Sequence, residues 1–131
     1  MTTEAQFYRR LRDNLERCEF TRLESRATLG LPDLLIAFEE GFFITLELKV
    51  VRSGMKVALS AHQVSFHARH ATLGCPAGIL VACLHLDEIR LYSAAQAVEL
   101  QLQGLRVEPV GCWPLRRAPW HVIRDALTGL A

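Results

Sequence analysis

The sequence predicts an α/β fold in which a central mixed sheet is flanked by helices. The two clearest strands, Asp33–Phe38 and Phe42–Val50, are separated only by the turn Glu39–Gly41 and should form an antiparallel hairpin. A helix beginning near Ser60 precedes the segment Ala77–Leu84, whose residues are all apolar or small, as is typical of a buried strand. Because a helix separates this strand from the hairpin, a parallel crossover should join them.

Capping patterns and glycines set the limits of the helices. Residues Thr3–Gln6 and Ser60–Gln63 have the form of capping boxes, in which a Ser or Thr and a Gln three residues later satisfy free N–H groups. We expect one domain, residues 1–131, with a core of about residues 4–92 and a C-terminal extension of about residues 93–131. The expected elements are a helix from Glu4, a short strand at Phe20–Ser25, the hairpin, a helix from Ser60 to about Gly74, strands at Ala77–Leu84 and Ile89–Tyr92, a helix from Ser93 to about Gly104, and a last helix through Leu127.

The composition is that of an ordinary globular chain. Half of the residues are hydrophobic, 22% are charged and the net charge is +1, so any contact with nucleic acid must come from local clusters of basic residues. No apolar run reaches the roughly 18–20 residues of a membrane span, and the N-terminus lacks a signal-peptide pattern, so we expect no membrane association. The four cysteines form no CxxC pair, which favours reduced thiols in a cytoplasmic protein.

A Glu and a Lys interrupt the second strand of the hairpin. Because strand side chains alternate, Glu47 and Lys49 should project from one face. Leu46 and Leu48 should then project from the other. Charged groups in an apolar strand are costly to bury unless something compensates them, as a divalent cation would for the carboxylate and a phosphate for the ammonium. Asp33 starts the neighbouring strand, so the hairpin can bring its carboxylate beside that of Glu47.

This set of groups suits metal-dependent phosphate chemistry. Two carboxylates, a backbone carbonyl and waters are ligands that Mg²⁺ prefers, and such an ion polarises a phosphate and acidifies bound water. A lysine beside it would orient the water or neutralise charge that develops on the phosphate. The alternative is an exposed hairpin salt bridge, worth about half a kcal/mol, but the surrounding strand is too apolar for a solvent face.

The order of these residues resembles the PD-(D/E)xK nuclease superfamily, because Pro32 and Asp33 are followed, after the hairpin, by Glu47, Leu48 and Lys49. Finer features resemble its VRR-NUC branch, found in phage nucleases and in nuclease domains of some repair enzymes. These features are Gly30-Leu31-Pro32-Asp33 opening a strand, Glu47-Leu48-Lys49 closing the next, Leu59-Ser60-Ala61-His62-Gln63 opening the following helix, and Gly74-Cys75-Pro76 before an apolar strand. The resemblance spans roughly residues 4–84. It departs at Ala61, where the branch commonly has proline.

The resemblance implies a restriction-endonuclease-like αβββαβ core and a role for each matching residue. Asp33 and Glu47 would be metal ligands together with the carbonyl of Leu48, and the cofactor would be Mg²⁺ or Mn²⁺. Lys49 would be the catalytic lysine. Gln63 would be a supporting catalytic glutamine, although a glutamine in a capping box needs no catalytic reason.

Other residues near these positions leave alternatives open. The family places an acidic residue on the first helix, which Glu4 matches, but Glu4 could equally complement the helix dipole. Glu24, in the first predicted strand, is a rival for this additional metal contact. Arg52 and Lys56 lie in a basic, mobile loop after the hairpin and could contact flanking DNA phosphates or simply be solvated.

The helix after the basic loop carries three histidines with no matching carboxylate. We therefore interpret His62, His67 and His70 as residues on the helix surface or facing a partner, not as metal ligands.

Together these features predict a Mg²⁺- or Mn²⁺-dependent endonuclease that hydrolyses phosphodiester bonds in DNA, in a bacterial or phage-encoded cytoplasmic protein. The small, nearly neutral domain and its resemblance to enzymes that resolve branched DNA favour a homodimer acting on branched structures such as Holliday junctions. Two alternatives stay open: a non-catalytic DNA-binding or assembly subunit that retains the fold, and a nuclease directed at flaps or RNA.

Overall fold

Six strands form one mixed sheet in chain order. The computed structural model describes residues 3–131. The strands lie in the order β1-β2-β3-β4-β5-β6, with β3 and β4 parallel and the other neighbours antiparallel. The elements are α1 (Glu4–Asn14), β1 (Cys18–Arg22), β2 (Leu34–Phe38), β3 (Phe42–Val51), α2 (Ala61–Thr72), β4 (Ala77–Cys83), β5 (Glu88–Ser93), α3 (Ala97–Gln103), β6 (Gly111–Pro114) and α4 (Trp120–Thr128), with 3₁₀ turns at Leu84–Leu86, Ala94–Gln96 and Gly104–Arg106.

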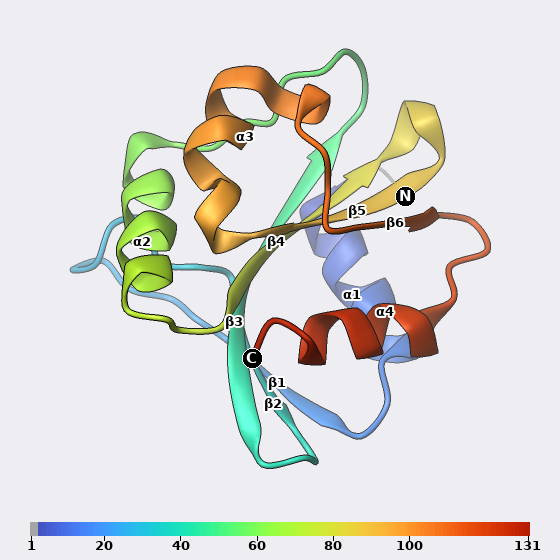
Figure 1. Cartoon of the computed structure of the whole chain (residues 1–131). Helices are drawn as coiled ribbons and strands as arrows, with labels where there is room; N and C mark the ends of the chain where they lie inside the picture. The colour runs from blue at the N-terminus through green and yellow to red at the C-terminus, as the bar shows by residue number, and fades with distance from the viewer. Residues whose placement is uncertain (1–2) are drawn as a thin grey trace.

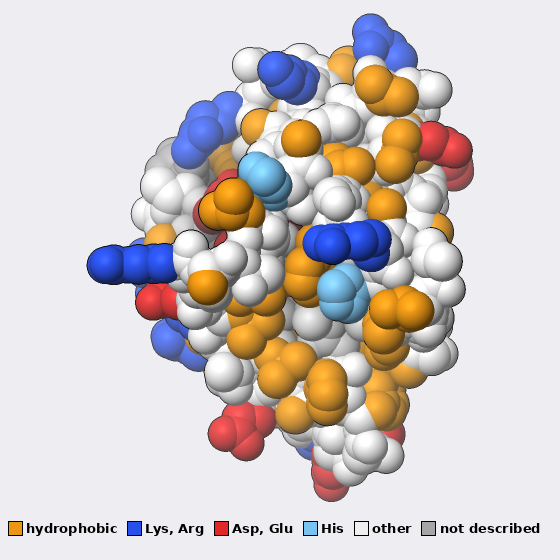
Figure 2. Space-filling model, turned by 90° about the vertical axis from the view of Figure 1, so that its left-hand side faces the viewer, with side chains coloured by type: hydrophobic (Ala, Val, Ile, Leu, Met, Phe, Trp, Pro, Cys, Tyr) orange, Lys and Arg blue, Asp and Glu red, His pale blue; other side chains and the backbone are white. Residues whose placement is uncertain are grey.

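Helices cover both faces of this sheet (Figure 1). On one face Phe7 of α1 and Ile123 of α4 are fully buried in the larger part of the core. On the other face Leu100 of α3 and Val64 of α2 pack on a second cluster that includes Ile79 of β4. The predicted α/β fold with a mixed sheet flanked by helices is therefore confirmed. Apolar side chains are spread over much of the outer surface on the α2 side (Figure 2).

The two strands of the hairpin differ in length, and this difference creates an opening in the sheet. β2 has 5 residues and β3 has 10. Their pairing ends where Leu34 meets Leu46, whereas β3 continues beside β4 as far as Val51. Beyond Leu46, the side of β3 that faces away from β4 therefore has no strand partner in the described part of the chain. Main-chain polar groups there are available to side chains or ligands.

The loop before β2 packs tightly against the start of α2. Gly30 has a φ of 79°, and a Cβ atom at this position would lie 2.2 Å from the main-chain oxygen of His62. Only glycine fits this combination of left-handed backbone and close approach. Since Asp33 follows three residues later, the contact helps to fix where that side chain enters the sheet.

Two predicted elements need correction, and one strand was not predicted. The first strand ends at Arg22 and not at Ser25, because the Ser25 hydroxyl accepts hydrogen bonds from two following N–H groups and closes a turn. The helix expected from Ser93 begins as a 3₁₀ turn, so α3 is shorter. The sequence pattern does not predict β6, which pairs with β5. Residues 93–131, expected as a C-terminal extension, contribute β6 to the sheet and Ile123 and Leu127 to the core. Within residues 3–131, none of the helices combines the length and apolar character that crossing a bilayer requires.

Candidate active site

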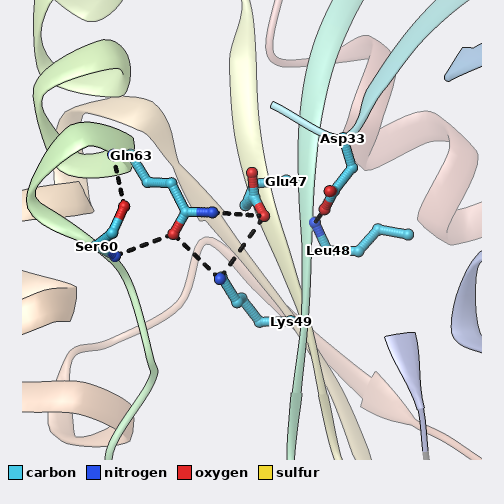
Figure 3. Close-up of polar contacts among 6 residues, drawn as sticks. All are labelled: Asp33, Glu47, Leu48, Lys49, Ser60 and Gln63. Carbon is cyan, nitrogen blue, oxygen red and sulfur yellow. Dashed lines mark hydrogen bonds and ion pairs between the residues drawn. The ribbon is translucent and has the colours of Figure 1, made fainter. Parts of the chain in front are cut away.

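The hairpin brings Asp33 and Glu47 to the open end of the β2–β3 pair. Asp33 directly precedes Leu34, whose partner is Leu46, so Asp33 lies opposite Glu47. Asp33 Oδ2 accepts a hydrogen bond of 2.8 Å from the main-chain N–H of Leu48 (Figure 3). This bond satisfies an N–H group left free where β2 ends and holds the carboxylate against the edge of β3.

Glu47 is buried, with 1% of its surface exposed. Its Oε2 accepts a hydrogen bond of 3.2 Å from Gln63 Nε2 and lies 3.8 Å from Lys49 Nζ. Its Oε1 finds no hydrogen-bond partner within residues 3–131. Burial raises the pKa of Glu47 to about 9, and the neighbouring Asp33 carboxylate adds to this shift while Lys49 opposes it. Lys49 therefore offsets only part of the cost of burying the charged form of Glu47.

Gln63 connects Glu47 and Lys49 to the start of α2 (Figure 3). Its Oε1 accepts hydrogen bonds from Lys49 Nζ at 3.1 Å and from the main-chain N–H of Ser60 at 3.0 Å. The Ser60 hydroxyl accepts a bond from the Gln63 N–H in return, which completes the predicted capping box. Because Oε1 already accepts two donors, the amide must present Nε2 to Glu47. The same glutamine therefore caps the helix and orients two residues of the site.

A pocket of about 50 Å³ lies beside Asp33 on the α1 side of the sheet. The carbonyl of Leu48 faces the same edge of β3 as its N–H group, because both groups of a strand residue point to the same neighbour. The residues that line the pocket are Glu4, Ala5, Tyr8, Arg22, Asp33, Leu34 and Leu48.

Of the two acidic residues considered for an additional metal contact, Glu4 and Glu24, it is Glu4 that lines this pocket. Partial burial raises its pKa, the Asp33 carboxylate acts in the same direction, and Lys49 and Arg52 act in the opposite one. Glu24 lies in the exposed loop beyond β1 and does not line the pocket. The structure therefore brings Glu4, and not Glu24, close to Asp33.

The donor set fits a hard divalent cation that keeps part of its hydration shell. Within residues 3–131, no three His, Cys, Asp or Glu side chains form a group that could hold a metal ion by themselves. The available ligands are the carboxylates of Asp33 and Glu47 and the carbonyl of Leu48, with Glu4 farther along the pocket. Mg²⁺ typically uses one or two carboxylates and several waters, and the unpartnered Glu47 Oε1 is an oxygen that such an ion would satisfy.

The two basic residues proposed to contact DNA lie in different places. Arg52 is close enough to Glu4 to lower its pKa. Lys56 lines a separate groove with Gln101 and Arg106. The segment between β3 and α2 is not the free loop that the sequence predicts, because the main-chain oxygen of Met55 accepts a bond of 2.7 Å from the N–H of Leu105.

One buried residue near the site was not predicted. His62 is exposed, as expected, but His67 is fully buried, and neither of its ring nitrogens has a hydrogen-bond partner in the described part of the chain. Burial lowers the pKa of His67 to about 4. His70 is partly covered and stacks on Phe66, with 3.8 Å between ring centroids. The signal for His67 is its position one turn after Gln63, which places both side chains on one helix face.

Comparison with known proteins adds nothing to this geometry. No protein-family model matches the chain, and a search of curated proteins finds no similar sequence.

Proposed function

We propose that this protein is a metal-dependent endonuclease that hydrolyses phosphodiester bonds in DNA. The observation that carries the proposal is Glu47: a buried carboxylate with one unpartnered oxygen, opposite Asp33 and two residues before Lys49. In a purely structural ion pair, both oxygens of a buried carboxylate are normally hydrogen-bonded. An oxygen without a partner is one that a bound cation would satisfy. The element order α1-β1-β2-β3-α2-β4 is also consistent with the restriction-endonuclease-like core that the sequence resemblance implies.

Asp33, Glu47 and the carbonyl of Leu48 would hold Mg²⁺ or Mn²⁺, with Glu4 as a further ligand directly or through water. When bound, the ion would polarise the scissile phosphate and acidify a water molecule. Lys49 would donate hydrogen bonds to oxygen atoms on which charge develops during the reaction.

Gln63 would keep Lys49 in place during this reaction. Its Oε1 is 3.1 Å from Lys49 Nζ, so the ammonium is already oriented before substrate binds. Its Nε2 bond to Glu47 Oε2 leaves the other carboxylate oxygen for the cation. Gln63 is thus a positioning residue in this mechanism, not a group that reacts.

For the substrate we propose branched DNA, such as a Holliday junction, cut by a homodimer. Leu73, Val98 and Leu102 are exposed at α2 and α3, and the apolar character of this side of the molecule supports self-association (Figure 2). Large exposed apolar surfaces are typical of interaction sites.

The test is an incubation of the protein with linear, nicked, flap and four-way DNA and with RNA, each with Mg²⁺, with Mn²⁺ and with EDTA. We expect metal-dependent cleavage that is fastest on four-way DNA. Asp33→Asn is the matched inactive control, because it keeps the side-chain volume and removes an anionic oxygen from the cation site. Binding of DNA without cleavage under every metal condition would instead support a non-catalytic DNA-binding subunit.

A further inference from the structure

An arginine on the α1 side of the site has no role in the mechanism above. Arg22 is the last residue of β1, and its guanidinium carbon lies 4.9 Å from the centre of the Tyr8 ring. It pairs with Leu34, whose side chain is buried beneath α1, so the Arg22 side chain lies on that same face of the sheet. Arg22, Glu4 and Asp33 all line the small pocket.

The donors of this guanidinium are unused. Within residues 3–131, the Arg22 guanidinium forms an ion pair with no acidic residue and donates no hydrogen bond, and it lies on the Tyr8 ring. Arg12 provides a contrast on the same ring: its guanidinium lies 5.6 Å from the Tyr8 centre and pairs with Asp13 at 3.3 Å. An arginine held on an aromatic face with five free donors is preorganised to bind an anion.

The position of Arg22 relative to Lys49 indicates which anion Arg22 would bind. Lys49 and Glu47 project from the face of β3 that α2 covers, since Leu48 between them packs on the α1 side. Arg22 is on the opposite face, where it lines the small pocket together with the carboxylates of Glu4 and Asp33. A DNA strand that crosses the open edge of β3 with a phosphate at the cation site would therefore meet Lys49 on one side and Arg22 on the other.

We infer that Arg22 binds a backbone phosphate of the cleaved strand and that Tyr8 holds its guanidinium in position. This inference rests on the proposed nuclease function. Arg22 is then a DNA-binding residue, in contrast to Lys49, whose role lies in the reaction. Its loss should weaken binding more than it slows the reaction of bound DNA.

The experiment is a titration of the full chain with fluorescein-labelled four-way DNA in Ca²⁺ over a range of salt concentrations, paired with single-turnover cleavage in Mg²⁺ at saturating protein. We expect Arg22→Ala to weaken binding about 10-fold and to reduce the slope of log affinity against log salt by about one, as loss of one phosphate contact predicts. Arg22→Lys should restore the salt slope but only part of the affinity, because it lacks the planar, two-pronged donor set. The cleavage rate of bound DNA should change only a few-fold.

Arg12→Ala is the matched control, because it removes the other arginine from the Tyr8 ring and should leave affinity and salt slope unchanged. If Arg22→Ala does not fold, Arg22→Gln gives the same comparison while keeping a long stem on the ring. Equal salt slopes for the Arg22 and Arg12 variants and the parent, in a parent that cleaves DNA, would overturn the inference and leave the proposed function intact. A parent that neither binds nor cleaves DNA in any metal would overturn both.

Discussion

Glu47 and Arg124 are buried almost equally, with 1% and 3% of their surfaces exposed, but they differ in how completely they are hydrogen-bonded. Arg124 of α4 donates to the main-chain oxygens of Glu16 and Arg17 at 2.7 and 2.9 Å and to both carboxylate oxygens of Glu40 at 2.8 and 2.7 Å. Glu47 has a long ion pair, one hydrogen bond and an oxygen with no partner in the described residues.

The pKa shifts of Glu47 and of Glu40, the partner of Arg124, reflect this difference. The Arg124 hydrogen bonds lower the pKa of Glu40 to about 2, whereas burial raises the pKa of Glu47 to about 9. A complete set of partners is what a structural ion pair requires, and Arg124 fastens α4 to the α1–β1 connection in this way. An incomplete set at a buried charge is costly to the fold and therefore indicates a site that a ligand completes.

The largest expected effect comes from Glu47→Gln. This change keeps the side-chain volume and removes the charge, so we expect single-turnover cleavage of four-way DNA in Mg²⁺ to fall by on the order of 10³-fold or more. The free energy of unfolding in EDTA should stay equal or rise, because burial raises the pKa of Glu47 and glutamine carries no such cost of protonation on folding. Glu39→Gln, at an exposed carboxylate in the hairpin turn, is the control. Cleavage by Glu47→Gln at the parent rate would contradict a cation site at this position.

Arg124→Ala should have the opposite pattern, with loss of stability and little loss of activity. It breaks one side of a partly buried ion pair and removes the Arg124 donor from the main-chain oxygen of Glu16 and from that of Arg17, which keeps its bond from the N–H of Glu39. Urea unfolding should therefore show a loss of about 3 kcal/mol. The matched control is Arg116→Ala, which breaks the exposed pair with Asp87 and should cost less than about 1 kcal/mol. Cleavage by Arg124→Ala should remain near the parent rate at a temperature where it is folded. A large catalytic defect in the folded variant would contradict a purely structural role.

The sequence predicted the parts of this fold that depend on short-range patterns. The hairpin follows from apolar segments on either side of a turn at Gly41, and the start of α2 follows from Ser60 and Gln63, which form the expected capping box. Asp33 lies opposite Glu47 as alternation and the hairpin require. These features involve residues that are close in sequence, so local chemistry determines them.

The missed features depend on packing between distant segments. β6 is a strand of four residues that ends in proline, and it exists because β5 offers an edge. Burial of His67 without partners results from how α2 lies on the sheet. The choice between Glu4 and Glu24 depended on where β1 ends, which the turn at Ser25 decides. No periodicity in the sequence encodes these three-dimensional contacts.

Lys49→Ala tests whether Lys49 acts in the reaction or only in DNA binding. We expect the single-turnover rate to fall by on the order of 10²-fold, comparable to loss of one donor to a developing negative charge, while affinity for DNA in Ca²⁺ changes only a few-fold. Lys49→Arg should rescue poorly, because a broad guanidinium cannot replace an ammonium packed between Gln63 and Glu47. Lys56→Ala, at the chain's other lysine, is the control and should retain the parent rate. An affinity loss as large as the rate loss would make Lys49 a tether for DNA.

The smallest expected effect is on the pH dependence of stability in EDTA, and it compares the two carboxylates directly. The pKa of Glu47 rises from its ordinary 4.5 to about 9 in the folded protein. Its contribution to stability is therefore full below about pH 4.5 and is lost as the pH rises toward 9, with a limiting slope of roughly 1.4 kcal/mol per pH unit. Glu40 has the opposite sign: its pKa falls to about 2, so its contribution is full above pH 4.5 and is lost as the pH falls toward 2.

Differences between variants and parent isolate these two opposite slopes, because His67, whose own burial lowers its pKa to about 4, titrates alike in both members of a pair. The stability of Glu47→Gln relative to the parent should increase steadily from pH 5 to 8 in urea unfolding experiments. The parent should exceed Glu40→Gln in stability by a margin that shrinks as the pH falls from 5 to 3. Saturating Mg²⁺ should remove most of the first slope, because an ion on Glu47 favours its charged form, and should leave the second unchanged. Two results would contradict this comparison: stability differences that change with pH in the same direction for both variants, or a pH dependence of the Glu47 difference that Mg²⁺ does not alter. Either result would mean that both carboxylates serve only the fold and that Glu47 is not part of a cation site.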